Sequence, residues 1–178
     1  MTREADMAHE ALEPYEAEYE EMGYDGIPHR SERSETRSGS AQQSPQTSPD
    51  SAIVLLAEDD ADMRSLLSAA LARQGYEVME AKDGTELLEL VANGYLPQRP
   101  GGPDLIISDV RMPGWTGLDI LAGLRKQDWA MPVILITAFG DAETHREADR
   151  LGAVTMLDKP FDIEDLIKVA TKVVPPKI

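Results

Sequence analysis

The stretch IVLLAEDDADMR, residues Ile53–Arg64, decides the fold. Its first five residues, Ile53–Ala57, form a continuous apolar run of the kind that a fully buried β-strand shows. Apolar side chains at helical spacing follow and stop at Gly75, which predicts an amphipathic helix over Asp62–Gln74. Between the strand and the helix stand the carboxylates of Glu58–Asp60, which repel one another unless a positive group lies nearby.

The same pattern of a short apolar run followed by a helical segment continues to the end of the chain. Five such units in one chain imply an α/β fold, a doubly wound five-stranded parallel sheet of order 2-1-3-4-5, flavodoxin-like, with helices on both faces. The predicted strands are Ala52–Ala57, Tyr76–Ala81, Asp104–Asp109, Pro132–Thr137 and Ala153–Asp158, and the predicted helices are Asp62–Gln74, Thr85–Asn93, Leu118–Lys126, Ala142–Leu151 and Asp162–Val174.

Charge and composition exclude several classes of function. The formal net charge is −16, with 4 basic and 12 acidic side chains in residues 1–50 and 13 and 21 in residues 51–178. Phosphate backbones and anionic lipids repel such a chain, so we expect no direct binding to nucleic acid or membrane. The absence of cysteine excludes disulfides and thiolate chemistry. Neither a signal sequence nor a membrane-spanning apolar run is present, so the expected location is the cytoplasm.

The first fifty residues differ in amino-acid composition from the rest. A Glu-rich segment with three tyrosines leads into a stretch of Ser, Gln and Pro, and neither has enough apolar surface to form a core. We expect a disordered acidic tail and linker over residues 1–50 and one folded domain over residues 51–178. The tail is either a solubilising segment or a short docking element. A long Gly/Pro connection over Asn93–Pro103 is interpreted as a tolerated insertion.

Polar side chains follow strands that the predicted order makes neighbours. Glu58 and Asp59 come directly after the first strand, Asp109 ends the third, Thr137 ends the fourth and Lys159 follows the fifth. Ligands bind beyond the carboxyl ends of strands 1 and 3 in such sheets. Three carboxylates there favour a hard divalent cation such as Mg²⁺. An aspartate beside Mg²⁺, a lysine and a hydroxyl is equipped to attack a phosphoryl group and hold it as an aspartyl phosphate.

Four segments together resemble the receiver domain of two-component response regulators: LLAEDDADMR, DLIISDVRMPGWTGLDIL, VILITAFGD and MLDKPF. The resemblance covers residues 52–174 and implies a signalling phosphoacceptor of the single-domain type rather than a conventional enzyme. It implies that Glu58 and Asp59 bind Mg²⁺ together with the main-chain carbonyl of Arg111. By the same match, Asp109 is the phosphoacceptor and also a metal ligand.

The resemblance also assigns the two remaining polar groups. Thr137 is the switch hydroxyl that turns toward the phosphoryl group, and Lys159 contacts that group and precedes a proline in a cis peptide bond. One position departs from the family, because the aromatic switch residue three places before the lysine is Met156 here. Arg111 and Phe139 flank the path of the hydrolytic water in this family, and their side chains predict slow self-dephosphorylation.

Partners are likewise implied by the resemblance. A histidine kinase or a histidine phosphotransfer protein supplies the phosphoryl group, and the family commonly signals through the face made by helix 4, strand 5 and helix 5. Because the chain ends soon after its last predicted helix, we expect it to act through another protein, or through a phosphorylation-dependent homodimer. The expected basic partner surface on that face consists of Arg146, Arg150, Lys168 and Lys172.

Other interpretations of the same residues stay open from sequence. The DAD motif at Asp60–Asp62 imitates the nucleophile motif of haloacid-dehalogenase phosphatases, with Asp60 as nucleophile, and the fold order also suits a flavodoxin-like module that binds FMN. The acidic residues Asp60 and Asp62 are equally suited to cap the first helix. We interpret His145 as a solvated helix residue, and Trp115 and Trp129 as packing residues.

Overall fold

The computed structural model describes residues 51–92 and 103–176, in which five strands alternate with five helices. The predicted tail and linker, and most of the connection at Asn93–Pro103, lie outside the described residues. The elements are β1 (Ile53–Ala57), α3 (Ala61–Arg73), β2 (Glu77–Ala81), α4 (Gly84–Ala92), β3 (Leu105–Asp109), α5 (Gly117–Lys126), β4 (Val133–Thr137), α6 (Ala142–Arg150), β5 (Thr155–Asp158) and α7 (Ile163–Val173).

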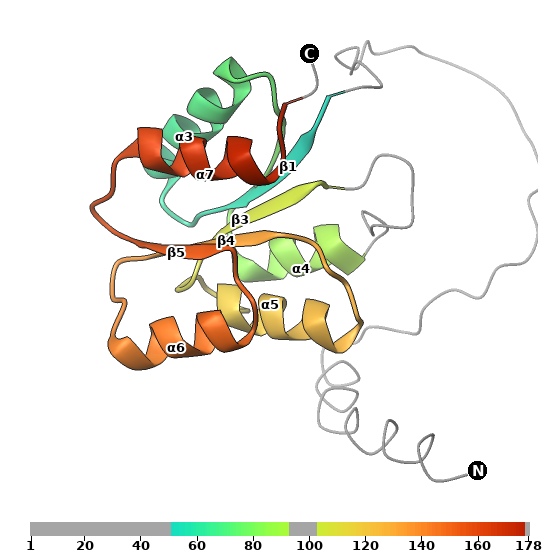
Figure 1. The fold of residues 1–178 in the computed structure, drawn as a ribbon, viewed down its shortest axis with the longest axis vertical. Helices are drawn as coiled ribbons and strands as arrows, with labels where there is room; N and C mark the ends of the chain where they lie inside the picture. The colour runs from blue at the N-terminus through green and yellow to red at the C-terminus, as the bar shows by residue number, and fades with distance from the viewer. Residues whose placement is uncertain (1–50, 93–102, 177–178) are drawn as a thin grey trace, which may run out of the picture. The chain divides into compact units, whose positions relative to one another are not determined.

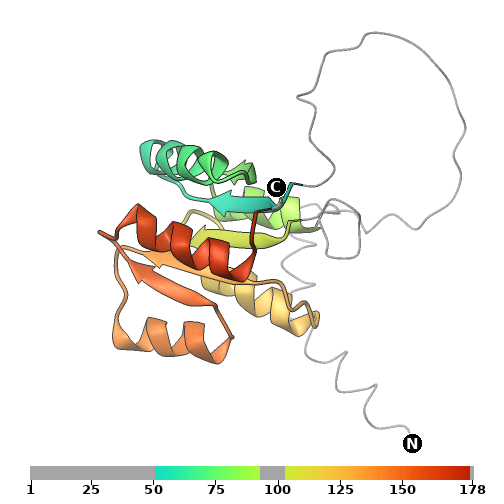
Figure 2. The same cartoon turned by 45° about the horizontal axis from the view of Figure 1, so that its top comes forward.

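The five strands form one parallel sheet of order β2-β1-β3-β4-β5, which confirms the predicted α/β fold and strand order. Each strand pairs with its neighbour in parallel register, for example Ala57 with Ser108 and Thr137 with Asp158. Because the strands are parallel, their carboxyl ends lie along one edge of the sheet, as the arrowheads in Figure 2 show. Residues that end or follow different strands therefore come together at that edge.

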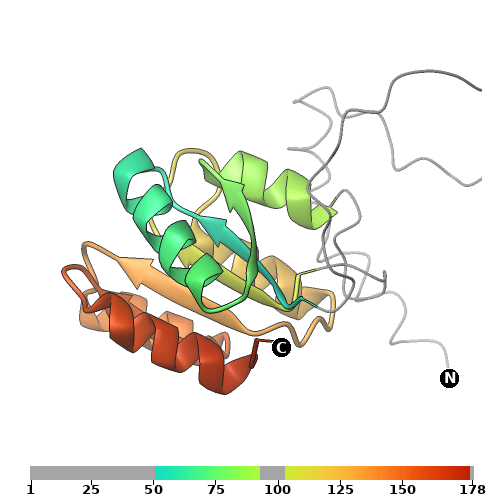
Figure 3. The ribbon, with the colours of Figure 1, turned by 90° about the horizontal axis from the view of Figure 1, so that it is seen from above.

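Helices cover both faces of the sheet (Figure 1). Alternate strand residues point to opposite faces, so Leu55 belongs to the core under α4, α5 and α6, while Leu56 belongs to the core under α3 and α7. Figure 3 looks from the side of α3 and α7, which lie next to each other. Strands covered on both faces explain why β1, β3 and β4 are continuous apolar runs.

All five described helices begin at capped positions near the same edge of the sheet, and at α4 Asp83 accepts a hydrogen bond from the N–H of Glu86. Asp60 caps α3 by accepting a hydrogen bond from the backbone N–H of Met63, while Asp141 and Asp162 cap α6 and α7. Thr116 and Asp119 form a reciprocal capping box at the start of α5. The prediction was right for Asp60 but wrong for the other proposed cap at α3, because Asp62 lies inside the first turn of the helix.

The predicted fifth strand was two residues too long. Gly152, with φ at 72°, ends α6, and the N–H of Ala153 still bonds to the carbonyl of Ala148 in that helix. Ala153 thus belongs to the helix end, and β5 begins only at Thr155. Within residues 51–92 and 103–176, no helix is both long enough and apolar enough to cross a membrane.

Candidate functional site

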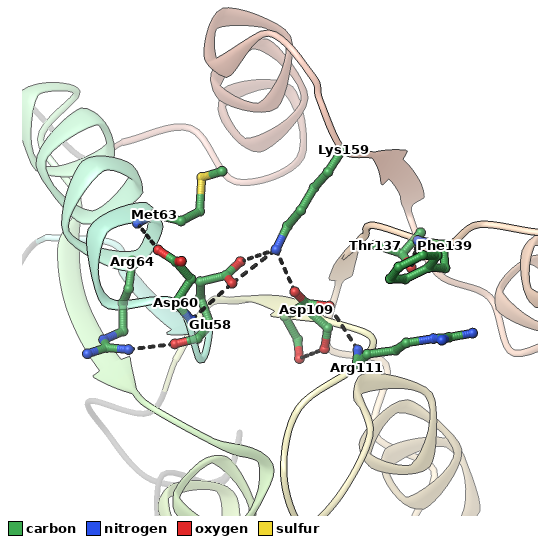
Figure 4. Close-up of polar contacts among 10 residues, drawn as sticks. Glu58, Asp60, Met63, Arg64, Asp109, Arg111, Thr137, Phe139 and Lys159 are labelled. Atoms are coloured by element: carbon green, nitrogen blue, oxygen red, sulfur yellow. Dashed lines mark hydrogen bonds and ion pairs between the residues drawn. The ribbon is translucent and has the colours of Figure 1, made fainter.

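The predicted site residues meet at the carboxyl edge of the sheet (Figure 4). Asp109 is the last residue of β3 and Thr137 the last of β4, while Glu58 follows β1 and Lys159 follows β5. Glu58 and Thr137 are fully buried, and Asp109 is 4 % exposed. Polar groups this deeply buried need partners, so the contacts among them define the site.

The Lys159 ammonium lies between two buried carboxylates. Its Nζ atom is 2.8 and 3.0 Å from the two carboxylate oxygens of Glu58 and 2.5 Å from Oδ2 of Asp109. The side chain of Lys159 is 18 % exposed, so the pairs are shielded from water. Lys159 thus places a positive group beside Glu58, the first carboxylate after β1, and it links the ends of β1, β3 and β5 through side-chain contacts.

Burial and pairing shift the pKa values of this cluster. Burial raises the pKa of Glu58 above its ordinary value, and the hydrogen bond and charge of Lys159 only partly oppose this. Burial alone would lower the pKa of Lys159, but its hydrogen bonds to Asp109 and Glu58 hold that pKa above the ordinary value. Lys159 is therefore charged at neutral pH. Any cation placed beside Glu58 would stabilise the charged form of that carboxylate.

Glu58, Asp59 and Asp109 are arranged as a set of metal ligands. One carboxylate oxygen from each lies within 4.8 Å of the others, and Asp59 is exposed while Glu58 and Asp109 are buried. A set made only of oxygen atoms suits a hard divalent cation, and the exposed side leaves room for the waters that Mg²⁺ retains. The backbone N–H of Arg111 donates to Oδ1 of Asp109 at 2.8 Å, which brings the Arg111 segment beside that carboxylate.

Arg64, which sequence reasoning missed, fixes the loop that carries the first two carboxylates. Its Nη1 donates to the main-chain carbonyl of Glu58 at 2.7 Å, and its Nε lies 3.4 Å from Oε2 of Glu80 on β2. Helical side chains point back toward the N-terminus of their helix, which brings this arginine over the preceding loop. The only sequence signal is an arginine in the first turns of the helix that follows the acidic run.

The hydroxyl of Thr137 bonds to the loop that follows it. It accepts a hydrogen bond from the backbone N–H of Phe139 at 3.1 Å, and the carbonyl of Thr137 accepts one from the N–H of Lys159 at 2.7 Å. The peptide bond between Lys159 and Pro160 is cis, as the resemblance implied. Thr137 therefore lies at the same edge as Asp109, with its hydroxyl engaged by its own loop.

Arg111 and Phe139 contact each other across the site. The guanidinium carbon of Arg111 lies 4.9 Å from the centre of the Phe139 ring, which is a cation–π distance, and Phe139 is 64 % exposed. The pair joins the loop after β3 to the loop after β4. Met156, at the position of the family's aromatic residue, is half-buried and packs against the core under α4, α5 and α6.

Other predicted residues have different surroundings. His145 is not simply solvated, because its Nε2 atom lies 3.1 Å from both carboxylate oxygens of Asp158. Trp115 and Trp129 pack against the core, as predicted. The carboxylate of Asp60 is occupied by its role as a helix cap.

Two of the four cations of the expected basic partner surface pair with carboxylates on their own helices. Arg150 pairs with Glu147, and Lys168 pairs with Asp165. These pairs reduce the positive field that the surface presents. Lys168 also lines an apolar groove between α3 and α7.

Comparisons with known proteins agree with this geometry. The family model described as response regulator receiver domain matches residues 54–171. Sporulation initiation phosphotransferase F of Bacillus subtilis is 32 % identical over 124 residues, which cover 70 % of this chain and 94 % of that protein. Regulatory protein AtoC of Escherichia coli is 37 % identical over 113 residues, which cover 64 % of this chain but only 23 % of that protein. This chain thus spans about a quarter of AtoC and nearly all of the phosphotransferase.

Solved structures show the same likeness in three dimensions. The chemotaxis protein CheY4 of Vibrio cholerae matches with a TM-score of 0.59 and 34 % sequence identity, over 69 % of this chain and 98 % of that one. The receiver domain of the Francisella response regulator 1452 matches with a TM-score of 0.59 and 32 % identity, over 66 % of this chain and 93 % of that one.

Proposed function

The chain belongs to the response regulator receiver domain family, whose members are signalling phosphoacceptors, and on this premise we propose that Asp109 is its phosphoacceptor. The observation that supports this choice best is the contact of Lys159 with Asp109, because it places a fixed positive charge beside a buried carboxylate at the end of β3. Phosphoryl transfer depends mainly on such positioning and on neutralising negative charge.

The proposed reaction uses side chains from four strand ends. One carboxylate oxygen of Asp109 forms a bond to phosphorus while the bond from phosphorus to the donor's imidazole nitrogen, or to the acetate oxygen of acetyl phosphate, breaks. Lys159 then pairs with a phosphoryl oxygen, and the hydroxyl of Thr137 leaves Phe139 to bond to another. A bound Mg²⁺, held by Glu58, Asp59, Asp109 and the main-chain carbonyl of Arg111, would supply further positive charge to the phosphoryl oxygens.

Mass spectrometry of the intact protein tests the proposal directly. After incubation with acetyl phosphate and Mg²⁺, the protein should gain the mass of one phosphoryl group, and a chelator should prevent this. The proposed self-catalysed phosphorylation would be contradicted if the protein gained no mass under any of these conditions while circular dichroism showed that it remained folded.

We expect metal binding to be visible in the fluorescence of Trp115. This residue lies in the loop between β3 and α5, and Arg111 in the same loop contacts Asp109, so a bound Mg²⁺ should change its surroundings. Asp59→Ala should abolish the response because it removes the exposed ligand, whereas Asp62→Asn, which changes a neighbouring exposed carboxylate in α3, should retain it. A response that survives in Asp59→Ala, or is lost in Trp129→Phe, would contradict this assignment.

The contact between Arg111 and Phe139 predicts a long phosphoryl lifetime. Phe139 offers no group that orients a hydrolytic water, Arg111 is expected to pair with a phosphoryl oxygen rather than with that water, and their contact lies beside Asp109. The double variant Arg111→Asn with Phe139→Glu should hydrolyse at least about tenfold faster, because a carboxylate there can accept a proton from the attacking water. The decay of phosphorylated protein, with the donor removed and Mg²⁺ retained, measures this. An unchanged rate of hydrolysis in the double variant would show that the two side chains do not slow the attack of water on the phosphoryl group.

We also propose how the chain is divided into regions and which partners it binds. Residues 51–178 form the receiver domain and residues 1–50 an acidic tail and linker. A histidine kinase or phosphotransfer protein is the proposed donor. The proposed downstream surface is the face of α6, β5 and α7, where Arg146 and Lys172 would supply positive charge beside the paired Arg150 and Lys168. Phosphorylation changes binding there only if the partner, or a second copy, prefers one state of the domain.

A further inference from the structure

The contact between His145 and Asp158 joins α6 to β5 beside the loop that follows β4. Asp158 ends β5 and lies opposite Thr137 in the register of β4 and β5. His145 lies in the first turns of α6, which starts five residues beyond Thr137. Its Nε2 atom reaches back to both carboxylate oxygens of Asp158 at 3.1 Å. The contact therefore links α6, which follows the loop over residues 138–141, to β5, which pairs with the strand before that loop.

Gly140 passes directly against this contact. A Cβ atom at Gly140 would lie 1.9 Å from Oδ1 of Asp158, 2.7 Å from Nε2 of His145 and 3.0 Å from Cγ2 of Thr137. No side chain fits there without moving these groups, so the present contact between His145 and Asp158 requires glycine at position 140. We call the group formed by Gly140, His145 and Asp158 the loop clasp.

The clasp holds the same loop that engages the hydroxyl of Thr137. The N–H of Phe139 donates to that hydroxyl at 3.1 Å, and the carbonyl of Phe139 accepts from the N–H of Asp141 at 3.2 Å. Asp141 in turn caps α6, whose next turn carries His145. Movement of the hydroxyl toward Asp109 must break its bond to Phe139, which removes one hydrogen bond that holds the loop backbone beside Gly140. Any movement of that backbone changes the contact between His145 and Asp158, because Gly140 lies against both side chains.

We propose that His145 and Asp158 are positioning residues that hold this loop in the arrangement where Thr137 bonds to Phe139. The clasp thereby opposes the movement of the Thr137 hydroxyl toward a phosphoryl group on Asp109. This inference rests on the proposed function of Asp109 and Thr137. A ligand shifts a conformational equilibrium only by its differential affinity, so a weaker clasp lets the phosphorylated arrangement form more easily.

The expected effect is modest because the contact is partly exposed. The side chains of His145 and Asp158 are 37 % and 55 % exposed, and contacts of this kind contribute little. Loss of the clasp should therefore tighten the binding of a phosphoryl mimic by about threefold. Beryllofluoride with Mg²⁺ is a suitable mimic, and calorimetry measures its affinity without depending on any single reporter residue.

Four variants test the clasp. His145→Ala and Asp158→Ala should each bind beryllofluoride about threefold more tightly, and the double variant should show no further gain because both changes break the same contact. Gly140→Ala should change affinity in the same direction, since its methyl group displaces the clasp from the other side. The matched control is Glu147→Gln, which breaks the pair with Arg150 on the same helix and should bind as the wild type does.

Two readouts separate positioning from general loss of structure. His145→Gln keeps a side-chain N–H donor and should restore affinity toward that of the wild type. In the wild type, the ring signals of His145 in NMR spectra, identified by their loss in His145→Gln, should shift when beryllofluoride binds. Unchanged affinity in both His145→Ala and Gly140→Ala, in a protein that still gains one phosphoryl group, would overturn the clasp alone. A wild type that neither binds the mimic nor gains the mass would overturn the proposed function as well.

Discussion

Replacing Asp109 with asparagine should abolish transfer of a phosphoryl group from acetyl phosphate to the protein. Asparagine keeps the shape of the side chain but lacks the nucleophilic carboxylate that forms the bond to phosphorus, and it also removes one negative charge from the metal set. Lys159 would still pair with Glu58, at 2.8 Å, so the variant should fold. We therefore expect the intact mass of Asp109→Asn to stay unchanged under conditions in which the wild type gains one phosphoryl group.

The matched control for this prediction is Asp60→Asn. Asparagine caps helices as well as aspartate does, so α3 should remain intact. Asp60 is the nucleophile that the haloacid-dehalogenase interpretation requires, yet in the structure its carboxylate accepts the N–H of Met63 at 2.8 Å. We expect Asp60→Asn to be phosphorylated like the wild type. Loss of labelling in Asp60→Asn with normal labelling in Asp109→Asn would reverse the assignment.

When no metal is present, replacing Lys159 with methionine should lower the free energy of unfolding more than any other substitution proposed for this site. The variant leaves the buried carboxylates of Glu58 and Asp109 facing each other without a cation. Removing one partner of a buried ion pair costs about 3–5 kcal/mol, and we expect the lower end, about 3 kcal/mol, because Lys159 is 18 % exposed. Urea unfolding of both proteins in the presence of a chelator measures the difference in free energy of unfolding.

Addition of Mg²⁺ should restore part of that stability. A cation bound by Glu58, Asp59 and Asp109 replaces the lost positive charge, so Mg²⁺ should stabilise Lys159→Met more than the wild type. The matched control is Lys168→Met, which removes a lysine from an exposed pair with Asp165 and should leave stability unchanged. If Lys159→Met were as stable as the wild type in chelator, the ammonium would not be the group that neutralises this cluster.

The strand ends of the site were predictable because a parallel sheet fixes which ends are neighbours. Once β1, β3, β4 and β5 are recognised as apolar runs, the strand order brings Glu58, Asp109, Thr137 and Lys159 to one edge whatever the details of packing. The sequence does not show that Lys159 contacts both carboxylates at once. That contact depends on the path of the side chain and on how deeply each carboxylate is buried.

The contacts of Arg64 and His145 were not predictable for a related reason. Both are helical residues that reach out of their helices to a loop or strand far along the chain, Arg64 to Glu80 and His145 to Asp158. No periodic pattern marks such pairs, because they depend on how a helix is set against the sheet. The tail and linker assigned to residues 1–50 remain a prediction from composition.

The most direct test of the central claim locates the phosphoryl group. Sodium borohydride reduces an aspartyl phosphate to homoserine, and mass spectrometry of the resulting peptides then identifies the converted residue. After treatment with acetyl phosphate and Mg²⁺, we predict homoserine at position 109 and at no other aspartate of the chain. Homoserine at position 60, or a protein that carries the phosphoryl mass with Asp109 unconverted, would contradict the assignment of Asp109 as the phosphoacceptor.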